Sequence, residues 1–494
     1  MKLYELLSDV GEYQIFGQNN VNIENLSQNS KKAAKNMLFF CINGTKTNGN
    51  FYIDEAVKNG AIAVLSDKFI QPKEINTKLK NTENDYCGSI TQIIVPNVRK
   101  AMAKICANFY HNPQKKLKIV GVTGTSGKSS TSFLIYEMLR LENKKVGLIG
   151  TSGIYFENYQ YDLNMTTPDS IDLFEIFSKM VKYSIEYCVM EVSAHAIFFD
   201  KIYGIDFAVK VLTNIKSDHL DFFKTRSNYE KVKLSFFNKE CTAVINSDDK
   251  ISKKISKNCP KSIKFGEKCA NFLISNIKCE LGETSFQLKF HDEIYTINSL
   301  LTGKFNVWNI TCALAVLYAL NLDFQNVIPM IKSIHKIDGR FDVVFKSNGF
   351  NVVIDYAHTY DSLENFLNSV NSVSQNINII VFGAPGERDS TKRFPMGELA
   401  GELCDVVILT TDNPASENPR RIMFEMEQGV KETKAQCFLI ENRKKAIKKA
   451  IKIAKKAKNC NILVVGKGAE TYQIVGDKHV PYSDYIAVYD CLSE

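Results

Sequence analysis

The sequence predicts an α/β protein with three α/β domains: a doubly wound, mostly parallel sheet forms the central domain, and a Rossmann-like sheet the C-terminal one. Short apolar runs rich in β-branched residues alternate with helix-length segments, which is typical of parallel sheets. A length of 494 residues allows about two to four domains. A glycine-rich loop lies between one apolar run and a helix, which indicates a phosphate-binding centre.

The composition is that of a cytoplasmic protein. A hydrophobic content of 45% and a charged content of 23% are ordinary for a soluble chain. Thirteen cysteines occur without a CxxC pair, which argues against a disulfide framework or a zinc site. The N-terminus has no apolar signal core, and apolar runs stay short of the ~18 residues of a membrane span.

Much of the net charge of +8 comes from residues 443–458. Helical spacing there places one set of small apolar residues on a single face: Ala446, Ile447, Ala450, Ile451, Ala454 and Ala457. We expect a packed helix with a solvated basic face and no nucleic-acid partner, and nucleic-acid contact is the weaker alternative.

Residues 1–110 form the first predicted domain, with strands at 39–42 and 61–65 and a helix that starts at Ile53 and stops at Asn59. Residues 111–336 form the second. Its predicted strands are 117–122, 146–149, 187–190, 207–212 and 242–245. Polar residues follow several of these strands, and ligands of doubly wound sheets bind at such carboxyl ends.

Residues 337–494 form the third predicted domain. Its strands are expected at 351–354, 377–382, 405–409 and 461–465. Each strand again ends in polar residues or glycine, which predicts a second functional edge.

The loop itself reads TGTSGKSS from Thr123 to Ser130. Glycines at 124 and 127 let backbone N–H groups face phosphate oxygens, and the following helix adds positive charge. Lys128 can reach the terminal phosphates of ATP, and the Ser129 hydroxyl can bind Mg²⁺. The strict motif has glycine where this chain has Val122. An ordinary turn between strand and helix is the alternative.

Three further residues are candidates for the same centre. Glu191 stands at a strand end, where a carboxylate commonly binds Mg²⁺. His219 follows Asp218 and is either a metal ligand or an ordinary loop histidine. Lys233 lies on a predicted helix over 228–237, and by itself it is most simply a surface lysine.

These residues carry a resemblance. The segments TGTSGKSS, EVSAH, TNIKSDHLDF, NYEKVK, INSDD, GKFNVWN, DGRFD, DYAHT, GERD, TDNPA and GKGAETYQ occur in the order typical of the Mur ligase family. The chain resembles the branch that adds the third amino acid in peptidoglycan synthesis, over nearly its whole length. The resemblance implies UDP-binding, ATP-binding and amino-acid-binding domains.

Matched position by position, the resemblance implies four groups of residues. ATP would contact Gly124, Thr125, Ser126, Gly127, Lys128, Ser129, Ser130, Asn306, Arg340, Asp355 and His358. Mg²⁺ would be held by Ser129, Glu191, His219 and Lys233, the last carbamylated to N6-carboxylysine; Lys128, Glu191, His219 and Lys233 would be catalytic. The UDP-N-acetylmuramoyl dipeptide would contact Ser30, Thr166, Thr167, Ser193 and Lys201. The free diamino acid would contact Arg388, Asp412, Asn413, Ala415, Gly466 and Glu470.

Some positions depart from the family pattern. Ala194 replaces a serine, Lys201 replaces an arginine, and Asn29-Ser30-Lys31 replaces Asp-Ser-Arg. A lysine cannot form the paired hydrogen bonds of an arginine. A divergent paralogue that acts on a related nucleotide-peptide therefore stays open.

The expected reaction is ATP-dependent amide formation. A substrate carboxylate would attack the γ-phosphate to give an acyl phosphate, which the amine of an amino acid would then attack. A folylpolyglutamate synthetase-like ligase is one alternative, although residues 1–110 argue against it. A P-loop switch ATPase and an inactive paralogue are the others.

For the added amino acid the sequence favours L-lysine over meso-diaminopimelate, with ornithine as a further alternative. The resemblance places an arginine in diaminopimelate-adding relatives where this chain has Ala415, and a carboxylate in a pocket is best met by a guanidinium. Asp412 and Glu470 match positions that would receive an ammonium, and Arg388 would hold the α-carboxylate. Gly466 and the nearby Arg420 and Arg421 weaken this preference.

Overall fold

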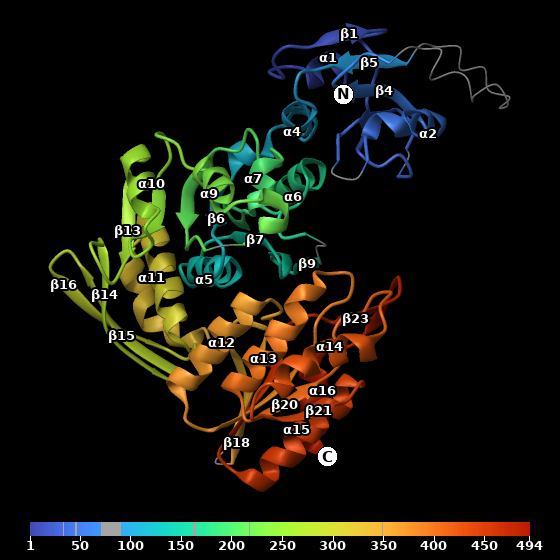
Figure 1. Ribbon diagram of the computed structural model, residues 1–494. Helices are drawn as coiled ribbons and strands as arrows, with labels where there is room; N and C mark the ends of the chain where they lie inside the picture. Colours follow the sequence, from blue (N-terminus) through green and yellow to red (C-terminus); the bar gives the residue numbers. More distant parts are fainter. Residues whose placement is uncertain (33, 45–46, 71–89, 162–164, 217, 348) are drawn as a thin grey trace. The chain divides into compact units, whose positions relative to one another are not determined.

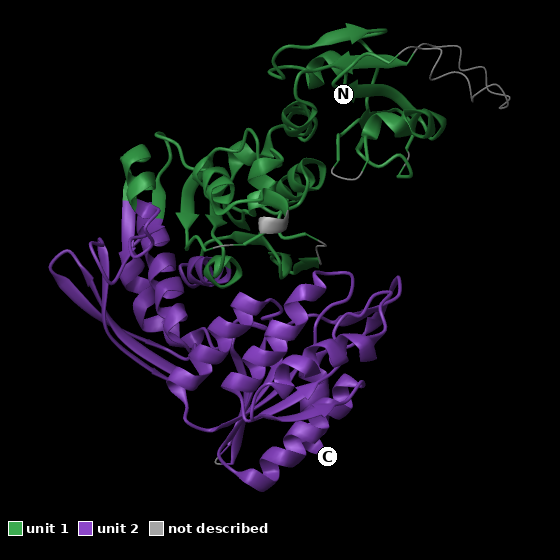
Figure 2. Cartoon of the chain, viewed as in Figure 1, with its two compact units in different colours: residues 1–132, 143–244, 253–262 green, residues 133–142, 245–252, 263–494 purple. Residues whose placement is uncertain are grey.

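We describe a computed structural model of the chain (Figure 1). The described residues are 1–494 apart from 33, 45–46, 71–89, 162–164, 217 and 348. The chain divides into two compact units, which we describe separately (Figure 2). Unit 1 comprises residues 1–132, 143–244 and 253–262, and unit 2 comprises residues 133–142, 245–252 and 263–494. The domain boundaries expected after residues 110 and 336 stay predictions.

The N-terminal part of unit 1 contains a five-stranded sheet in the order β1-β5-β4-β3-β2. All neighbours are parallel except β1 and β5. The strands are β1 (Gln14–Phe16), β2 (Asn25–Ser27), β3 (Met37–Phe40), β4 (Ala61–Ser66) and β5 (Thr91–Ile94), and the helices are α1 (Leu3–Leu6), η1 (Gly49–Tyr52), α2 (Ile53–Lys58) and α4 (Val98–Phe109). Helix α2 has its C-cap at Asn59, as predicted.

The remainder of unit 1 is built on the central parallel strands. β6 (Lys118–Thr123) lies between β10 and β11, with β7 beyond β10. The strands of this region are β7 (Val146–Gly150), β8 (Gly153–Phe156), β9 (Tyr159–Tyr161), β10 (Tyr187–Glu191), β11 (Phe207–Leu212) and β12 (Ala243–Asn246), and the helices are η2 (Pro113–Lys116), α5 (Lys128–Leu141), α6 (Ser170–Lys182), α7 (Ala194–Phe198), α8 (Leu220–Phe223), α9 (Arg226–Leu234) and α10 (Ser252–Asn258). Residues 133–141 of α5, residues 245–246 of β12 and the first residue of α10 are counted in unit 2. The five predicted strands of this region are confirmed to within one residue at each end.

Unit 2 ends in a six-stranded sheet in the order β17-β18-β22-β19-β20-β21. Only β17 is antiparallel to its neighbour. The strands are β17 (Asp342–Lys346), β18 (Phe350–Asp355), β19 (Ile377–Phe382), β20 (Val406–Leu409), β21 (Gln436–Leu439) and β22 (Cys460–Val465), and the helices are α12 (Tyr360–Val373), η4 (Ser390–Lys392), α13 (Arg393–Leu403), α14 (Pro419–Lys431), α15 (Arg443–Ala457) and α16 (Asp484–Ser493), with a β23 (Tyr472–Val475) and β24 (Lys478–Pro481) hairpin.

The two faces of this sheet are covered by different helices. Alternate strand residues such as Val353 and Ile380 pack with α12, α13 and α14. Their neighbours Val352 and Ile379 pack with α15 and α16. Strands buried on both faces explain the continuous apolar runs in the sequence, and the Rossmann-like prediction is confirmed.

The sequence analysis missed an antiparallel ribbon in unit 2. It consists of β14 (Phe272–Glu280), β15 (Glu283–Phe290) and β16 (Glu293–Ser299), and β14 also pairs in parallel with β13 (Ser262–Gly266). Helix α11 (Lys304–Ala319) and η3 (Phe324–Ser333) follow. In β15 buried residues alternate with more exposed ones, so the strand lacks the continuous apolar run by which the others were found.

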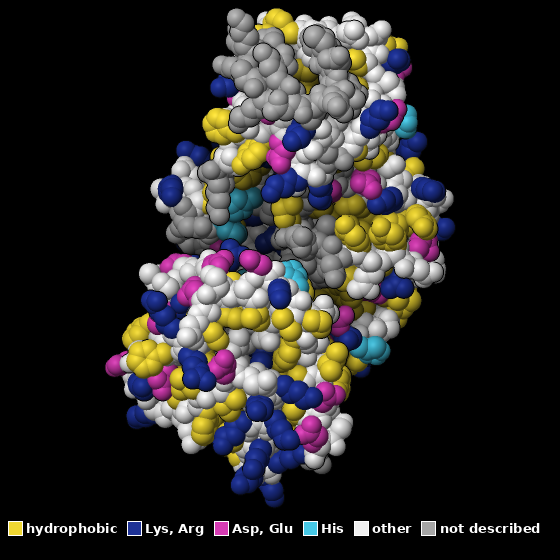
Figure 3. All heavy atoms as spheres, turned by 90° about the vertical axis from the view of Figure 1, so that its right-hand side faces the viewer, with side chains coloured by type: hydrophobic (Ala, Val, Ile, Leu, Met, Phe, Trp, Pro, Cys, Tyr) yellow, Lys and Arg dark blue, Asp and Glu magenta, His cyan; other side chains and the backbone are white. Residues whose placement is uncertain are grey.

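Helix α15 has the predicted amphipathic character. Five of its six predicted apolar positions are buried, whereas Ala457 is exposed because it lies at the last turn. Its exposed side carries lysines, and Lys and Arg side chains gather at the lower end of the view in Figure 3. Among the described residues, no helix is both long and apolar enough to cross a membrane.

Two glycines allow helices α13 and α14 to pack closely against each other. A Cβ on Gly397 would lie 2.0 Å from the Met426 carbonyl oxygen, and one on Gly429 would lie 2.1 Å from the Phe394 carbonyl oxygen.

We expect Gly397→Ala to lower the free energy of unfolding by about 1–3 kcal/mol, because the added methyl group would force α13 and α14 apart. Urea denaturation measures this change. Gly349→Ala is the control, because its Cβ would meet nothing within 4 Å; equal stability of both variants would contradict this packing.

Candidate active site

The phosphate-binding loop joins β6 to α5, as the sequence predicts. Gly124 and Gly127 have φ of +156° and +80°, and L-amino acids with side chains rarely adopt the latter. A Cβ on Gly124 would lie 1.9 Å from Thr213 Oγ1. The loop is therefore packed too tightly for any residue but glycine at position 124. Ser129 and Ser130 lie in the first turn of α5.

The end of β11 holds this loop in place. The Thr125 amide donates to the Asn214 carbonyl at 2.9 Å, and the Ser126 amide donates to Asn214 Oδ1 at 3.1 Å. Asn214 Nδ2 and Thr213 Oγ1 both donate back to the Ser126 carbonyl, at 3.0 and 2.7 Å. The loop is thus fixed by hydrogen bonds from a neighbouring strand end, which favours a preformed anion site.

Two lysines converge on one backbone oxygen of the loop. Lys128 Nζ donates to the Gly124 and Thr125 carbonyls at 3.0 and 2.9 Å. Lys233 Nζ, from α9, donates to the Gly124 carbonyl at 2.9 Å and to Thr123 Oγ1 at 3.0 Å. Both ammonium groups therefore lie against the backbone carbonyl of Gly124.

Lys233 is not a surface residue, because only 1% of it is exposed. Burial lowers the pKa of its ammonium well below the ordinary value, the charge of Lys128 lowers it further, and Asp218 opposes both. A lysine with a lowered pKa carries more of the neutral amine, which is the form that reacts with CO₂. The surface-lysine alternative is wrong, and the carbamylation stays a prediction.

Glu191 ends β10 beside the phosphate loop and is 2% exposed. The Thr151 amide donates to its Oε1 at 2.8 Å, and Thr151 Oγ1 donates to its Oε2 at 3.3 Å. Thr151 Oγ1 is also 3.1 Å from Thr166 Oγ1. The sequence analysis missed Thr151, although its position directly after β7 at the same sheet edge was an available signal.

His219 lies in the loop after β11 with its side chain 48% exposed. Its Nε2 is 3.6 Å from Asp218 Oδ2, and its ring meets that of His195 edge-on at 5.0 Å. The imidazole is thus accessible. With Ser129 and Glu191 it offers the hydroxyl, carboxylate and imidazole donors that a divalent cation accepts, whereas Lys233 would fit only as a carboxylated side chain.

The residues predicted to bind the UDP substrate are already bonded within the chain. Thr167 Oγ1 donates to the Glu191 carbonyl at 2.9 Å, and Ser193 Oγ caps α7 by accepting from the Ala196 amide. Lys201 forms an ion pair with Asp169 at 2.9 Å, and Ser30 Oγ donates to Glu55 Oε2 at 2.5 Å. These contacts position the side chains, and their binding roles stay predictions.

In unit 2, Asp355, Arg340 and His358 lie together at the end of β18. Asp355 accepts the Phe341 and Ala357 amides, each at 2.7 Å. Burial raises the pKa of its carboxyl, and Arg340 opposes this. The Arg340 guanidinium lies 4.5 Å from the centre of the Tyr356 ring, and His358 Nδ1 is 3.0 Å from the Tyr356 carbonyl.

Asn306 is 2% exposed. Its Nδ2 donates to the Thr302 carbonyl at 2.8 Å, and its Oδ1 accepts from Asn309 at 3.0 Å. Both ends of the amide are therefore used within the chain, and its predicted adenine contact stays a prediction.

Five of the six predicted amino-acid residues lie on two loops that touch, after β20 and β22. Gly466 follows β22 with φ of +115°, and a Cβ there would lie 2.5 Å from Asp412 Oδ2. Asn413 Nδ2 donates to Glu470 Oε2 at 3.1 Å. The Ala415 amide donates to the Ile474 carbonyl at 3.1 Å. Arg388 is exposed in the loop after β19.

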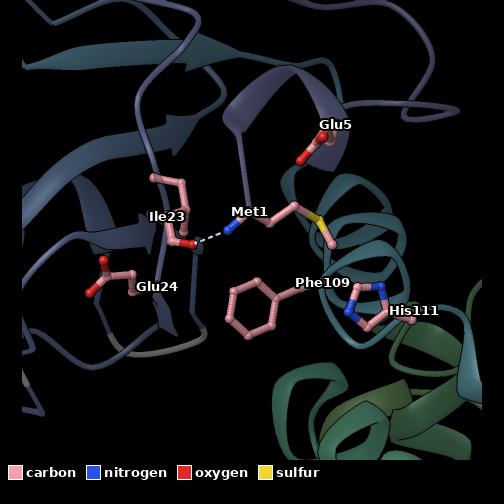
Figure 4. Close-up of a pocket in the computed structure, with 6 residues that line it drawn as sticks. All are labelled: Met1, Glu5, Ile23, Glu24, Phe109 and His111. Atoms are coloured by element: carbon pink, nitrogen blue, oxygen red, sulfur yellow. Dashed lines mark hydrogen bonds between the residues drawn. The ribbon is translucent and has the colours of Figure 1, made fainter.

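One pocket of the described chain lies apart from these residues. It has a volume of about 420 Å³ in unit 1 and is lined by Met1, Glu5, Ile23, Glu24, Phe109 and His111 (Figure 4). The Met1 ammonium donates to the Ile23 carbonyl at 2.9 Å. None of the predicted site residues lines it.

Three family models match the chain in order. They are "Mur ligase family, catalytic domain" over residues 22–110, "Mur ligase middle domain" over 122–317 and "Mur ligase, glutamate ligase domain" over 339–468. The chain is also 38% identical to a UDP-N-acetylmuramoyl-L-alanyl-D-glutamate–2,6-diaminopimelate ligase of Caldanaerobacter subterraneus, covering 100% of this chain and 99% of the relative.

The chain belongs to the Mur ligase family. A Clostridium acetobutylicum protein named as the same kind of ligase is also 38% identical, with 100% of both chains covered. A solved structure of a 2,6-diaminopimelate ligase matches with a TM-score of 0.68 and 25% identity, covering 100% of this chain and 99% of the other. The three-domain α/β fold class is confirmed.

Family membership decides between the classes of function left open by the sequence. Mur ligases are ATP-dependent acid–amino-acid ligases, so the switch ATPase is wrong. A Mycobacterium tuberculosis folylpolyglutamate synthase shares the fold with a TM-score of 0.61, but at 16% identity and over 74% of this chain. At this identity the similarity is evidence of a shared fold only.

The preference for L-lysine finds no support among these relatives, and the site gives a physical reason. Glu470, expected to attract the ammonium of a substrate, already accepts from Lys467 Nζ at 2.6 Å. Lys467 is 0% exposed, so its charge balances that of Glu470 inside this Mur ligase. The sequence analysis missed Lys467, although it lies three residues before Glu470.

We expect Lys128→Ala to lower ADP formation by about two to three orders of magnitude, because the positive charge at the phosphates is lost. We expect the fold to persist, because the Lys128 ammonium donates to carbonyls of its own loop. Lys182→Ala, an exposed lysine of α6, is the control. Normal turnover in Lys128→Ala would contradict the ATP-site assignment.

We expect Lys233→Ala to be inactive and to regain part of its activity with a short carboxylate such as acetate, which would replace a carboxylated side chain. Lys231→Ala, an exposed lysine of the same helix, should keep full activity. Labelled bicarbonate should give an NMR carbamate signal in the parent and none in Lys233→Ala. The same signal in both proteins would contradict carboxylation at Lys233.

Proposed function

We propose that this Mur ligase uses ATP to join 2,6-diaminopimelate to UDP-N-acetylmuramoyl-L-alanyl-D-glutamate in cytoplasmic peptidoglycan synthesis. The full-length match to relatives of that name carries the proposal. The phosphate loop with two lysines on the Gly124 carbonyl supports the same reaction class. Any such ligase must bring two anions together, namely the substrate carboxylate and the γ-phosphate.

The chain's residues would reduce this repulsion. The amides of the loop and the N-terminus of α5 would bind the β- and γ-phosphates, and Lys128 would turn from the loop carbonyls to the γ-phosphate. The substrate carboxylate would then attack phosphorus in line, and ADP would leave. The resulting acyl phosphate has a good leaving group, so the amine of the amino acid forms the amide and releases phosphate.

Ser129, Glu191, His219 and a carboxylated Lys233 would hold Mg²⁺, which would supply positive charge beside the transferred phosphoryl group. Thr151 would orient the Glu191 carboxylate by its two hydrogen bonds. Carboxylation of Lys233 would replace a cation beside Lys128 with an anion. That exchange removes the repulsion between the two ammonium groups and creates a metal ligand.

The choice of amino acid depends on the charge of the loops around Asp412 and Glu470. With Glu470 balanced by Lys467, the loops offer little excess negative charge to a lone ammonium. The distal end of diaminopimelate carries both an ammonium and a carboxylate and is neutral overall. Ala415 supplies no guanidinium to that carboxylate. Arg420 and Arg421, which could replace it, are exposed and paired with Glu441 and Glu425.

We expect the parent protein to release ADP only when UDP-N-acetylmuramoyl dipeptide and a diamino acid are both present. In competition at equal concentrations, meso-diaminopimelate should exceed L-lysine and L-ornithine in the product, measured by mass spectrometry. A product that contains mostly lysine or ornithine would overturn the amino-acid assignment but not the reaction. Absence of amide product with all three would overturn the proposed function.

In the same competition, Ala415→Arg tests whether position 415 faces the distal group. Ala415 already has φ of +49°, so arginine adds little backbone strain to that of alanine. A guanidinium facing the distal carboxylate should raise the ratio of diaminopimelate to lysine about tenfold or more. An unchanged ratio would mean that the side chain points elsewhere.

A further inference from the structure

Lys467 is a fully buried cation between the two loops that carry the predicted amino-acid residues. It follows Gly466 at the end of β22 and is 0% exposed. Its Nζ donates to Glu470 Oε2 at 2.6 Å and to Asn413 Oδ1 at 3.0 Å. Buried lysines are rare unless they are paired, and here the surrounding residues provide acceptors for the ammonium group.

Asn413 closes a ring with these two residues. Its Nδ2 donates to the same Glu470 oxygen at 3.1 Å. Its Oδ1 accepts from Lys467 and also from the Ile474 amide at 3.1 Å. The Lys467 ammonium thereby fixes the amide orientation of Asn413, and the ring ties residues 412–415 to residues 466–474.

The ring also sets the charge of the loops. The lysine and the glutamate neutralise each other, as do Arg443 and Asp484, which are both 0% exposed and paired at 2.8 Å. Asp412 is a further buried carboxyl on these loops: burial raises its pKa, and Arg443 and Lys467 oppose that rise. Removal of either partner of the ring would leave one uncompensated charge beside the amino-acid residues.

We propose that Lys467 is a specificity-determining residue, which selects a diamino acid with a neutral distal end over one with a lone distal ammonium by neutralising Glu470. This inference rests on the proposed function. It assigns the selection to the pairing of a buried lysine with the half-buried Glu470, whereas the sequence argument relied on Ala415 and on Asp412 and Glu470 as acids.

The test compares kcat/KM for meso-diaminopimelate with that for L-lysine in four proteins: the parent, Lys467→Met, Glu470→Gln and the double variant. Lys467→Met leaves Glu470 negative, so the ratio should fall about tenfold or more. Glu470→Gln leaves Lys467 positive, so the ratio should rise. The double variant is neutral again, and its ratio should return to within about threefold of the parent value.

If Lys467 only held the two loops together, its replacement would change kcat/KM for both amino acids by the same factor. Ratios that move in the same direction in both single variants, or do not move, therefore overturn the inference. The KM for ATP should stay at the parent value in all four proteins. Should Lys467→Met fail to fold by circular dichroism, the near-isosteric Glu470→Gln decides alone: a raised ratio supports the inference, and an unchanged or lowered ratio overturns it.

The parent protein separates this inference from the proposed function. A parent that forms no amide with either amino acid refutes the proposed function. A parent that forms amide while its variants keep the parent ratio refutes only the role of Lys467.

Discussion

The backbone carbonyl of Gly124 is the acceptor on which the predicted catalytic site of unit 1 depends. It receives both Lys128 and Lys233, so two cations are held beside one oxygen in a region that excludes water from one of them. The carbonyl is aimed by the conformation of Gly124, and Thr213 occupies the space that a side chain would need. The contact between β6 and β11 thus controls where the charges of the site lie.

Both units place their charged groups where parallel strands end. In unit 1, Glu191 ends β10 and the phosphate loop follows β6. In unit 2, Asp355 ends β18, and Asp412 and Lys467 follow β20 and β22 closely. Backbone groups at these ends have left the sheet ladder and can bind side chains, as the Phe341 and Ala357 amides bind Asp355. The chemistry of the chain therefore follows from its strand register.

The sequence predicted those structural features that are determined by residues adjacent in the chain. The five strands predicted for the central region are continuous apolar runs and were placed to within one residue at each end, whereas the parallel strands β2, β5 and β21 were not predicted. The loop between β6 and α5 was recognised from adjacent residues. The burial of Lys233 was also encoded, because it lies on the helix face of Tyr229 at an i, i+4 spacing. Thr151 was missed because its partner Glu191 is distant in sequence. Lys467 stands in the segment GKGAETYQ, but its burial cannot be read from that segment, so its role was missed.

The amino-acid preference shows why a site's charge must be summed over all its buried groups. In the sequence alone, Glu470 is an acid without a visible partner and Ala415 replaces a cation, and the two together favour lysine. The structure adds a cation 2.6 Å from that acid. Because the half-buried Glu470 is paired with this buried cation, the pair carries no net charge and attracts an ammonium less than a lone carboxylate would. On our proposal, selectivity follows from the balance between Lys467 and Glu470, and the residue at position 415 adjusts that balance without determining it alone.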